Sequence, residues 1–333
     1  MNKYIYIGLL ISLCFVQVIQ PKFYETIKLK TFDGLVADKE PSGNFAVLNI
    51  TEEDIANEGG YPLSRQTLAQ IHINLLRKGA IGVGWVIAFP QPDRFGGDFD
   101  FANALSFSPS VLAMFEGTGD YPPTTGTVVL GEDIGGLEAT GVIENIELLK
   151  QNGIQEIKVK GLPPVKTDSL GRKWISWTVP RETTLKEMDV ENRFVFVGFT
   201  AKGIMPQLAT PKGLLEPHKI QAALAESILI QDSPYIPDYS LFVELLITFI
   251  SICLVISLIN IFGITLGVTS TSIVFIVTGF SGYYLIQQGL LIDVVWSLIS
   301  QFVTATTAFY LRFREQYKLR QQIKQQFGKY LDP

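Results

Sequence analysis

Six charged residues follow stretches of sequence that predict β-strands, and they are the side chains best placed to bind a ligand. They are Glu52, Asp54, Arg65, Asp93, Asp98 and Lys202. Five of them lie in three turns, over Thr51–Asp54, Pro90–Asp98 and Thr200–Gln207, and Arg65 begins a predicted helix. In open α/β sheets ligands bind outside the carboxyl ends of the strands. If the three turns meet there, Arg65 and Lys202 could balance the charge of an anionic ligand.

The sequence supports no catalytic or metal chemistry. His72 and His218 are the only histidines, and the two cysteines, Cys14 and Cys253, fall in predicted membrane helices. A transition-metal site or a disulfide framework is therefore not expected. We expect His72 to be a packing residue of a helix, and His218 to cap its helix or to be exposed. No catalytic residue, cofactor or metal ligand is predicted.

Two further patterns are weak. The carboxylates of Asp93, Asp98 and Asp100 could hold a hard cation such as calcium, but their spacing is not that of a calcium loop. We favour a solvated loop. The glycines of Gly131–Gly136 are not followed by the Lys-Ser/Thr pair that a phosphate loop requires.

Alternating strand and helix signals position the candidate ligand residues. Strands are predicted over 45–51, 81–89, 111–115, 157–160, 173–179 and 194–199, and helices over 65–78, 98–107 and 217–230. Ser64 is a good N-cap for the first helix. The order strand 45–51, helix, strand 81–89 predicts a parallel pair with a right-handed crossover. The expected fold is an α/β sandwich with a mixed or mostly parallel sheet, joined to all-α transmembrane helices.

Charge is nearly absent from residues 241–311. From Leu241 to Leu311 there is no Lys or Arg. The block divides into runs over 241–261, 264–286 and 289–311, each of the roughly 20 residues that a membrane-spanning helix needs. An earlier run, Tyr4–Ile19, is predicted to be an uncleaved anchor, because no small-x-small cleavage site follows it.

Four passes would place both ends of the chain inside. Residues 1–20 form the anchor, 21–239 an outer domain, 240–311 three spans, and 312–333 a basic linker. Six basic and two acidic residues in 312–333 agree with this orientation, since basic residues beside a span stay in the cytoplasm. Tight turns are expected at 260–263 and 287–289.

Two carboxylates interrupt the apolar block. Glu244 and Asp293 lie near the outer ends of their predicted helices. We expect them to be hydrated at the headgroup level, and an ion path is the alternative.

The basic linker has two interpretations. Phe313, Ile323, Phe327 and Tyr330 fall on heptad core positions, which predicts a short coiled coil and a homodimer. A basic helix on the membrane surface is the alternative, and both remain open.

Four segments occur in an order that is similar to a known family. They are Asp33 after the anchor, Asn49–Glu52 with Gly60–Arg65, Asp93 with Asp98–Leu105, and Phe196–Gly203 followed by Thr210, Pro211 and a helix ending at Leu229. With three membrane helices after the domain, the order resembles the second class of CHASE sensor, an extracellular domain of bacterial cyclases and histidine kinases. The ending Gln326–Pro333 is similar to the linker that enters a class III nucleotide cyclase.

The chain departs from that pattern in three places. Val83–Val86 lacks the acid that the family carries there, and Asp168–Arg172 only partly keeps an acidic segment. Glu216–Lys219 stands in place of a Gly-x-x-x-His motif. These departures imply a different ligand, or none.

The resemblance implies a transmembrane signal-sensing protein of a bacterial inner membrane, with a periplasmic module that binds a small molecule or a peptide. Membrane lipid is the other expected partner, and an acidic outer domain argues against nucleic acid. The 333 residues include no output domain, so no enzymatic activity is expected of them. A non-sensory membrane scaffold and the N-terminal part of an adenylate cyclase are the alternatives.

Overall fold

The computed structural model describes residues 2–36, 39–114, 128–129, 156–157, 163–168, 173–178, 180–262 and 264–330. The chain divides into two compact units, described separately below. The helical unit comprises Met1–Val36 and Ile236–Pro333, and the α/β unit comprises Ala37–Tyr235. Features expected at 117–127, 131–136, 158–160 and 169–172 lie outside the described residues.

A parallel sheet forms the centre of the α/β unit. Its six strands are arranged in the order β4-β3-β2-β8-β1-β7, and every neighbouring pair is parallel. The strands are β1 (Phe45–Ile50), β2 (Gly82–Ala88), β3 (Ser110–Met114), β4 (Val128–Val129), β7 (Arg181–Thr184) and β8 (Phe194–Phe199). This arrangement confirms the predicted α/β class.

Strand β8 lies between β1 and β2, which corrects the expectation that β1 and β2 pair directly. Both strands align their first residues with Phe194 of β8. A side chain at Gly82 would lie 2.7 Å from the Phe194 ring, so the absence of one lets this ring pack against β2. The order of strands in the chain predicts that β1 and β2 belong to one sheet, but it does not predict that the apolar strand β8 lies between them.

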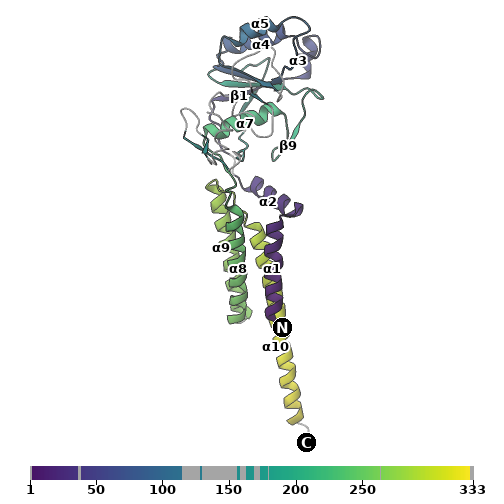
Figure 1. Ribbon diagram of the computed structural model, residues 1–333, viewed down its shortest axis with the longest axis vertical. Helices are drawn as coiled ribbons and strands as arrows, with labels where there is room; N and C mark the ends of the chain where they lie inside the picture. Colours follow the sequence, from purple (N-terminus) through teal and green to yellow (C-terminus); the bar gives the residue numbers. More distant parts are fainter. Residues whose placement is uncertain are drawn as a thin grey trace. The chain divides into compact units, whose positions relative to one another are not determined.

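Helices cover both faces of this sheet (Figure 1). On one face α3 (Glu52–Asn57), α4 (Arg65–Arg77) and α5 (Asp98–Leu105) bury Leu68, Leu75 and Phe101 against alternate strand residues. On the other face α7 (Pro217–Leu229) buries Ala222 and Ala225 against the intervening residues. Strands buried on both faces need the continuous apolar runs seen here.

Two small antiparallel sheets complete the described part of the unit. Strand β5 (Glu156–Ile157) pairs with β6 (Val165–Lys166), and β9 (Leu208–Thr210) pairs with β10 (Gly213–Leu215).

The helical unit consists of α1 (Asn2–Ile19), α2 (Lys22–Leu35), α8 (Ser240–Ile261), α9 (Ile264–Gln287) and α10 (Val295–Tyr330). Among the described residues, α8 and α9 are long and apolar enough to cross a membrane, and the pair α1–α2, bent by 74°, would make a third span if counted as one. The bend follows from Gln20, at φ 48°, and Pro21, whose ring restricts the backbone.

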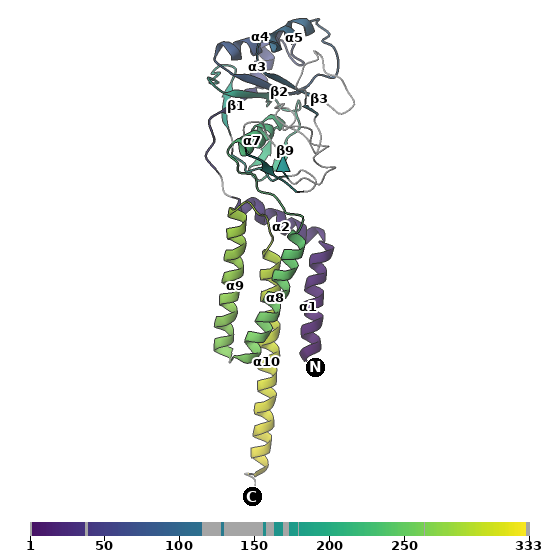
Figure 2. The same ribbon diagram turned by 60° about the vertical axis from the view of Figure 1, so that its left-hand side comes forward.

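Two expectations about this unit need correction. Residues 22–35, expected in the outer domain, form α2 and belong to the helical unit (Figure 2). The third apolar run becomes helical only at Val295 rather than at Gly289, and residues 290–294 before it are not helical. A side chain at Gly282 would lie 2.1 Å from Val294, so this glycine lets the segment pass close to α9.

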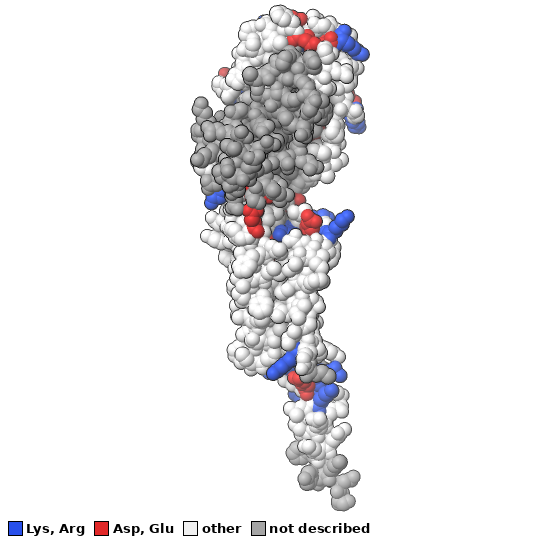
Figure 3. Space-filling model, viewed as in Figure 1, with Lys and Arg blue, Asp and Glu red and all other residues white. Residues whose placement is uncertain are grey.

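The surface and interior of the helical unit differ in polarity. On the face shown in Figure 3 the helices present uncharged residues along most of their length, with charged residues gathered at the upper end and where α10 extends beyond the other helices. Inside, hydroxyl and amide groups join the helices: Thr248 Oγ1 lies 2.7 Å from Ser297 Oγ, and Gln301 Nε2 donates to Thr278 Oγ1 at 2.9 Å. Such contacts stabilise helix pairs in lipid.

Candidate functional site

The three candidate turns follow neighbouring strands of the sheet. The turn after β8, at Thr200, lies between the turns after β1 and β2, because β8 is the neighbour of both. All three strands run in parallel, so their carboxyl ends meet at one edge. The backbone confirms this, since Thr200 N–H donates to Ile50 O at 2.9 Å.

Arg65, Asp93 and Asp98 form a local cluster beside this edge. The backbone N–H of Arg65 donates to Asp93 Oδ2 at 2.9 Å, and its Nε lies 3.6 Å from Asp98 Oδ1. The guanidinium stacks 4.1 Å above the ring of Phe89 and donates to Gln91 O at 3.3 Å. The Arg65 side chain is only 11% exposed, so most of its surface is already engaged within the protein.

Asp93 organises the loop that carries it. Besides Arg65, the backbone N–H groups of Phe95 and Gly97 donate to its carboxylate, each at 3.1 Å. Burial acts to raise the pKa of Asp93, but these N–H groups outweigh that effect and the pKa falls below its usual value. The cluster is therefore an anchor for the 90–98 loop rather than the solvated loop that the sequence suggested.

Asp54 likewise holds the backbone. It closes a capping box with Thr51, whose N–H and Oγ1 donate to Asp54 Oδ2 at 2.8 and 2.7 Å. The box begins α3, where we had expected a turn. The pattern Thr51-x-x-Asp54 is the sequence signal that predicts such a helix start.

Glu52 and Lys202 are the two candidates that remain exposed. Glu52 Oε1 accepts the backbone N–H of Lys202 at 3.2 Å, which joins the turns after β1 and β8. Their side chains face solvent at the carboxyl edge. Of the six candidates, these two are the most accessible to a ligand.

A second polar cluster lies on the α7 side of the same edge, and sequence reasoning missed it. His218 Nε2 lies 2.8 Å from Asn49 Oδ1, and Asn49 Nδ2 donates to Glu182 Oε2 at 2.7 Å. Lys219 Nζ is 3.1 Å from Glu182 and 3.2 Å from Glu216. Asn49 inside the apolar β1 run was the available signal, because a polar side chain in a buried strand needs a partner.

His218 is fully buried, which corrects the expectation of an exposed or capping residue. Its ring lies against Gly198, where a Cβ atom would come within 2.3 Å of Nδ1. Burial, aided by Lys219 and opposed by Glu216, lowers the pKa of His218 to about 4, so the ring is neutral at pH 7. His72 is buried as expected, and Trp85 Nε1 donates to its Nδ1 at 3.3 Å.

The helical unit holds a charged cluster instead of hydrated carboxylates. Glu244 is fully buried and Asp293 is 2% exposed, so the expected headgroup hydration is wrong. Lys28 Nζ lies 2.8 Å from Glu244 Oε1 and 3.0 Å from Oε2. The sequence signal for this buried ion pair was Lys28, which lies at helical spacing between the apolar residues Tyr24 and Phe32 on the buried face of α2.

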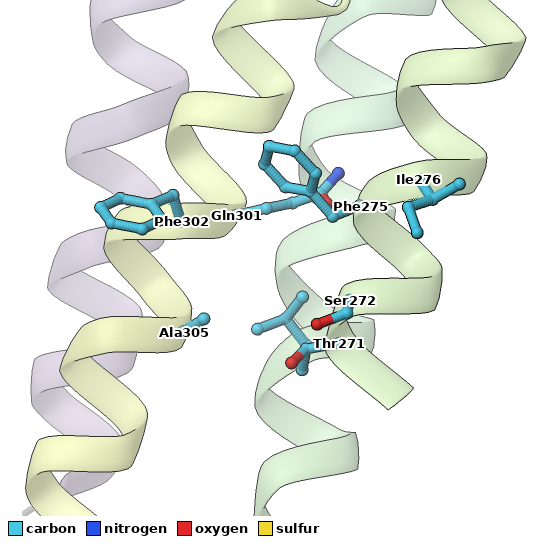
Figure 4. Close-up of a pocket in the computed structure, with 8 residues that line it drawn as sticks. Thr271, Ser272, Phe275, Ile276, Gln301, Phe302 and Ala305 are labelled. Atoms are coloured by element: carbon cyan, nitrogen blue, oxygen red, sulfur yellow. The ribbon is translucent and has the colours of Figure 1, made fainter. Parts of the chain in front are cut away.

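A cavity of about 260 Å³ lies among α8, α9 and α10 (Figure 4). Its lining is apolar apart from Gln301, Thr271 and Ser272, and both hydroxyls donate to carbonyls of their own helix. Among the described residues, no group of three or more His, Cys, Asp or Glu side chains is placed to hold a metal ion.

The family comparison matches most of the chain. A model of the CHASE2 domain matches residues 8–259, which extend from α1 to the end of α8. Comparisons with curated proteins and with solved structures find no match. The chain therefore belongs to the CHASE2 domain family, a family of extracellular sensory domains.

Proposed function

We propose that this chain is a transmembrane sensor of a bacterial inner membrane, in which the α/β unit binds a ligand outside the cell membrane and α10 carries the response inward. The observation that carries the proposal is the CHASE2 match over residues 8–259, together with the two apolar spans α8 and α9. The module resembles the input half of a class III cyclase receptor.

Four membrane passes make the proposal consistent. α1, α8, α9 and the first half of α10 would each cross once, which places the α/β unit outside and the basic end of α10 inside. Helix α2, bent by 74° from α1, then lies near the plane of the outer membrane surface.

Thiol labelling tests this topology. Cysteine would be introduced at Lys39 and, separately, at Gln325, both exposed, with Cys14 and Cys253 replaced by serine. A membrane-impermeant maleimide should label position 39 in spheroplasts and position 325 only after lysis. The opposite pattern would place the α/β unit in the cytoplasm and end the sensor proposal.

We place the ligand at the carboxyl edge of the sheet, beside Glu52 and Lys202. Lys202 would attract an anionic small molecule or peptide, whereas Arg65 would shape the site by holding the 90–98 loop. Native mass spectrometry of the purified chain should detect a bound species that is lost in Lys202→Ala. Lys78→Ala is the matched control, because Lys78 is exposed after α4 at the opposite edge of the sheet. Equal retention in both variants would exclude this edge as the site.

A homodimer through the end of α10 would connect two such sensors. Residues 312–326 are exposed except for the half-buried Arg312, and they include Phe313, Tyr317, Leu319 and Ile323. The tail continues α10 without a break, which favours a helical coiled coil over a separate helix on the membrane surface.

A further inference from the structure

Helix α2 touches each of the long helices that follow the α/β unit in the chain. It runs across their ends in Figure 2. Its Lys28 pairs with Glu244 of α8, and the ring of Tyr24 meets the ring of Trp296 in α10 edge-on at 5.4 Å. At its end, Leu35 O accepts Nε2 of Gln287 in α9 at 3.0 Å.

Helices α2 and α8 are the two elements that connect the α/β unit to the rest of the chain. The α/β unit begins at Ala37, directly after α2, and the chain leaves it at Tyr235, shortly before α8 begins at Ser240. A displacement of either connection would therefore act first on α2 or on α8. Two contacts between these helices meet at Glu244 of α8, one from Lys28 and one from Tyr24.

Glu244 also binds the segment that precedes α10. Its Oε1 accepts the backbone N–H of Asp293 at 2.9 Å, and its Oε2 accepts the hydroxyl of Tyr24 at 3.3 Å. Asp293 Oδ1 in turn accepts the N–H of Val295, the first residue of α10. One carboxylate thus binds α2 and the start of α10 at the same time.

Burial makes this arrangement sensitive to the loss of a partner. Glu244 is fully buried, and a buried charge that loses its partner is strongly destabilised. If Lys28 leaves, the carboxylate must find water, and it then withdraws from Asp293 as well. Loss of the α2 contact is therefore transmitted to the start of α10.

We propose that Glu244 is the coupling residue of this protein, and that α2 acts through it as a strap holding the segment 289–294 and the start of α10 in one position. The linkage is a property of the helical unit. Only its use in signalling rests on the proposed sensory function.

Hydrogen exchange of the full chain in lipid nanodiscs tests the linkage without a ligand. Lys28 is linked to segment 289–296 through Glu244, which binds both Lys28 and the N–H of Asp293. Lys28→Met should nevertheless raise amide exchange in 289–296 at least tenfold, as well as in α2, because the carboxylate loses its countercharge. Lys30→Met, two residues away and exposed, should change neither segment. Faster exchange in α2 alone would overturn the proposal.

Two variants keep the test decisive if Lys28→Met does not fold. The double variant Lys28→Met with Glu244→Gln should restore protection of 289–296, because an amide oxygen still accepts the Asp293 N–H and needs no countercharge. Tyr24→Phe removes the hydroxyl that donates to Glu244 Oε2 and should raise exchange in 289–296 by about tenfold, the effect of losing one hydrogen bond to a charged group. Unchanged exchange in Tyr24→Phe, or an unprotected segment in the double variant, would refute the coupling role. A failed ligand or topology experiment would leave these results untouched.

Discussion

His218 and Gly198 show how single residues define the carboxyl edge of the sheet. The imidazole takes the space that a side chain on β8 would fill, and it reaches Asn49 on β1. Because the ring is sealed from water, it is held in its neutral form. Acid should therefore destabilise this part of the fold.

The pH dependence of stability follows from the pKa of His218. Its folded-state pKa is about 4, below the roughly 6.5 of an unfolded histidine, so the stabilisation is full above pH 6.5 and is lost as the pH falls toward 4. Between pH 7 and pH 5 the loss should be about 2 kcal/mol. Urea unfolding at both pH values should show that His218→Asn loses less stability on acidification than the wild type, while His72 acts equally in both. An identical loss would mean that His218 is not sealed.

Residues of the candidate site could be found from the sequence, but their roles could not. Composition and strand order placed Arg65, Asp93 and Asp98 near the carboxyl edge, where they are. Their engagement with one another depends on loop geometry that no spacing rule predicts. The His218 cluster joins residues 49, 182 and 218, and pairings over such distances appear only once the sheet order is known.

At the scale of elements, the first turn of α3 separates structural from accessible carboxylates. Asp54→Ala should destabilise the α/β unit by about 1 kcal/mol, because it removes the carboxylate of the capping box. Glu52→Ala, in the same turn, removes an exposed acceptor of the Lys202 N–H and should destabilise the unit less than Asp54→Ala. Thermal unfolding of the two variants compares them directly, and equal losses would contradict the assignment.

Most elements were predictable because their signals are local. The Ser64 cap, the apolar runs of β1, β2 and β8, and the long apolar runs of α8 and α9 can each be recognised within a window of about 20 residues. The errors have a shared cause. The sequence of α2 does not predict a membrane-associated helix because Lys28 interrupts its apolar stripe. Segment 290–294 was expected to be helical because it is largely apolar, whereas the N–H of Asp293 bonds instead to Glu244, about 50 positions away.

At the scale of the whole molecule, the proposed dimer makes a prediction for the tail. In a cysteine-free background, Ile323→Cys should form a disulfide between two chains in native membranes on mild oxidation. Gln322→Cys, adjacent and also exposed, points away from the proposed seam and should cross-link far less. Non-reducing electrophoresis measures both, and equal or absent cross-linking would argue against the coiled coil.

The continuity of α10 limits the kind of motion that the chain can deliver. The helix runs for 36 residues, which at 1.5 Å per residue is about 54 Å, with no proline inside it. Such a rod has no joint at which a movement could dissipate. In the proposed sensor, a rotation or axial slide at Val295 would reach the far end of α10 nearly intact, so the output would be a movement of the helix rather than the melting of a linker.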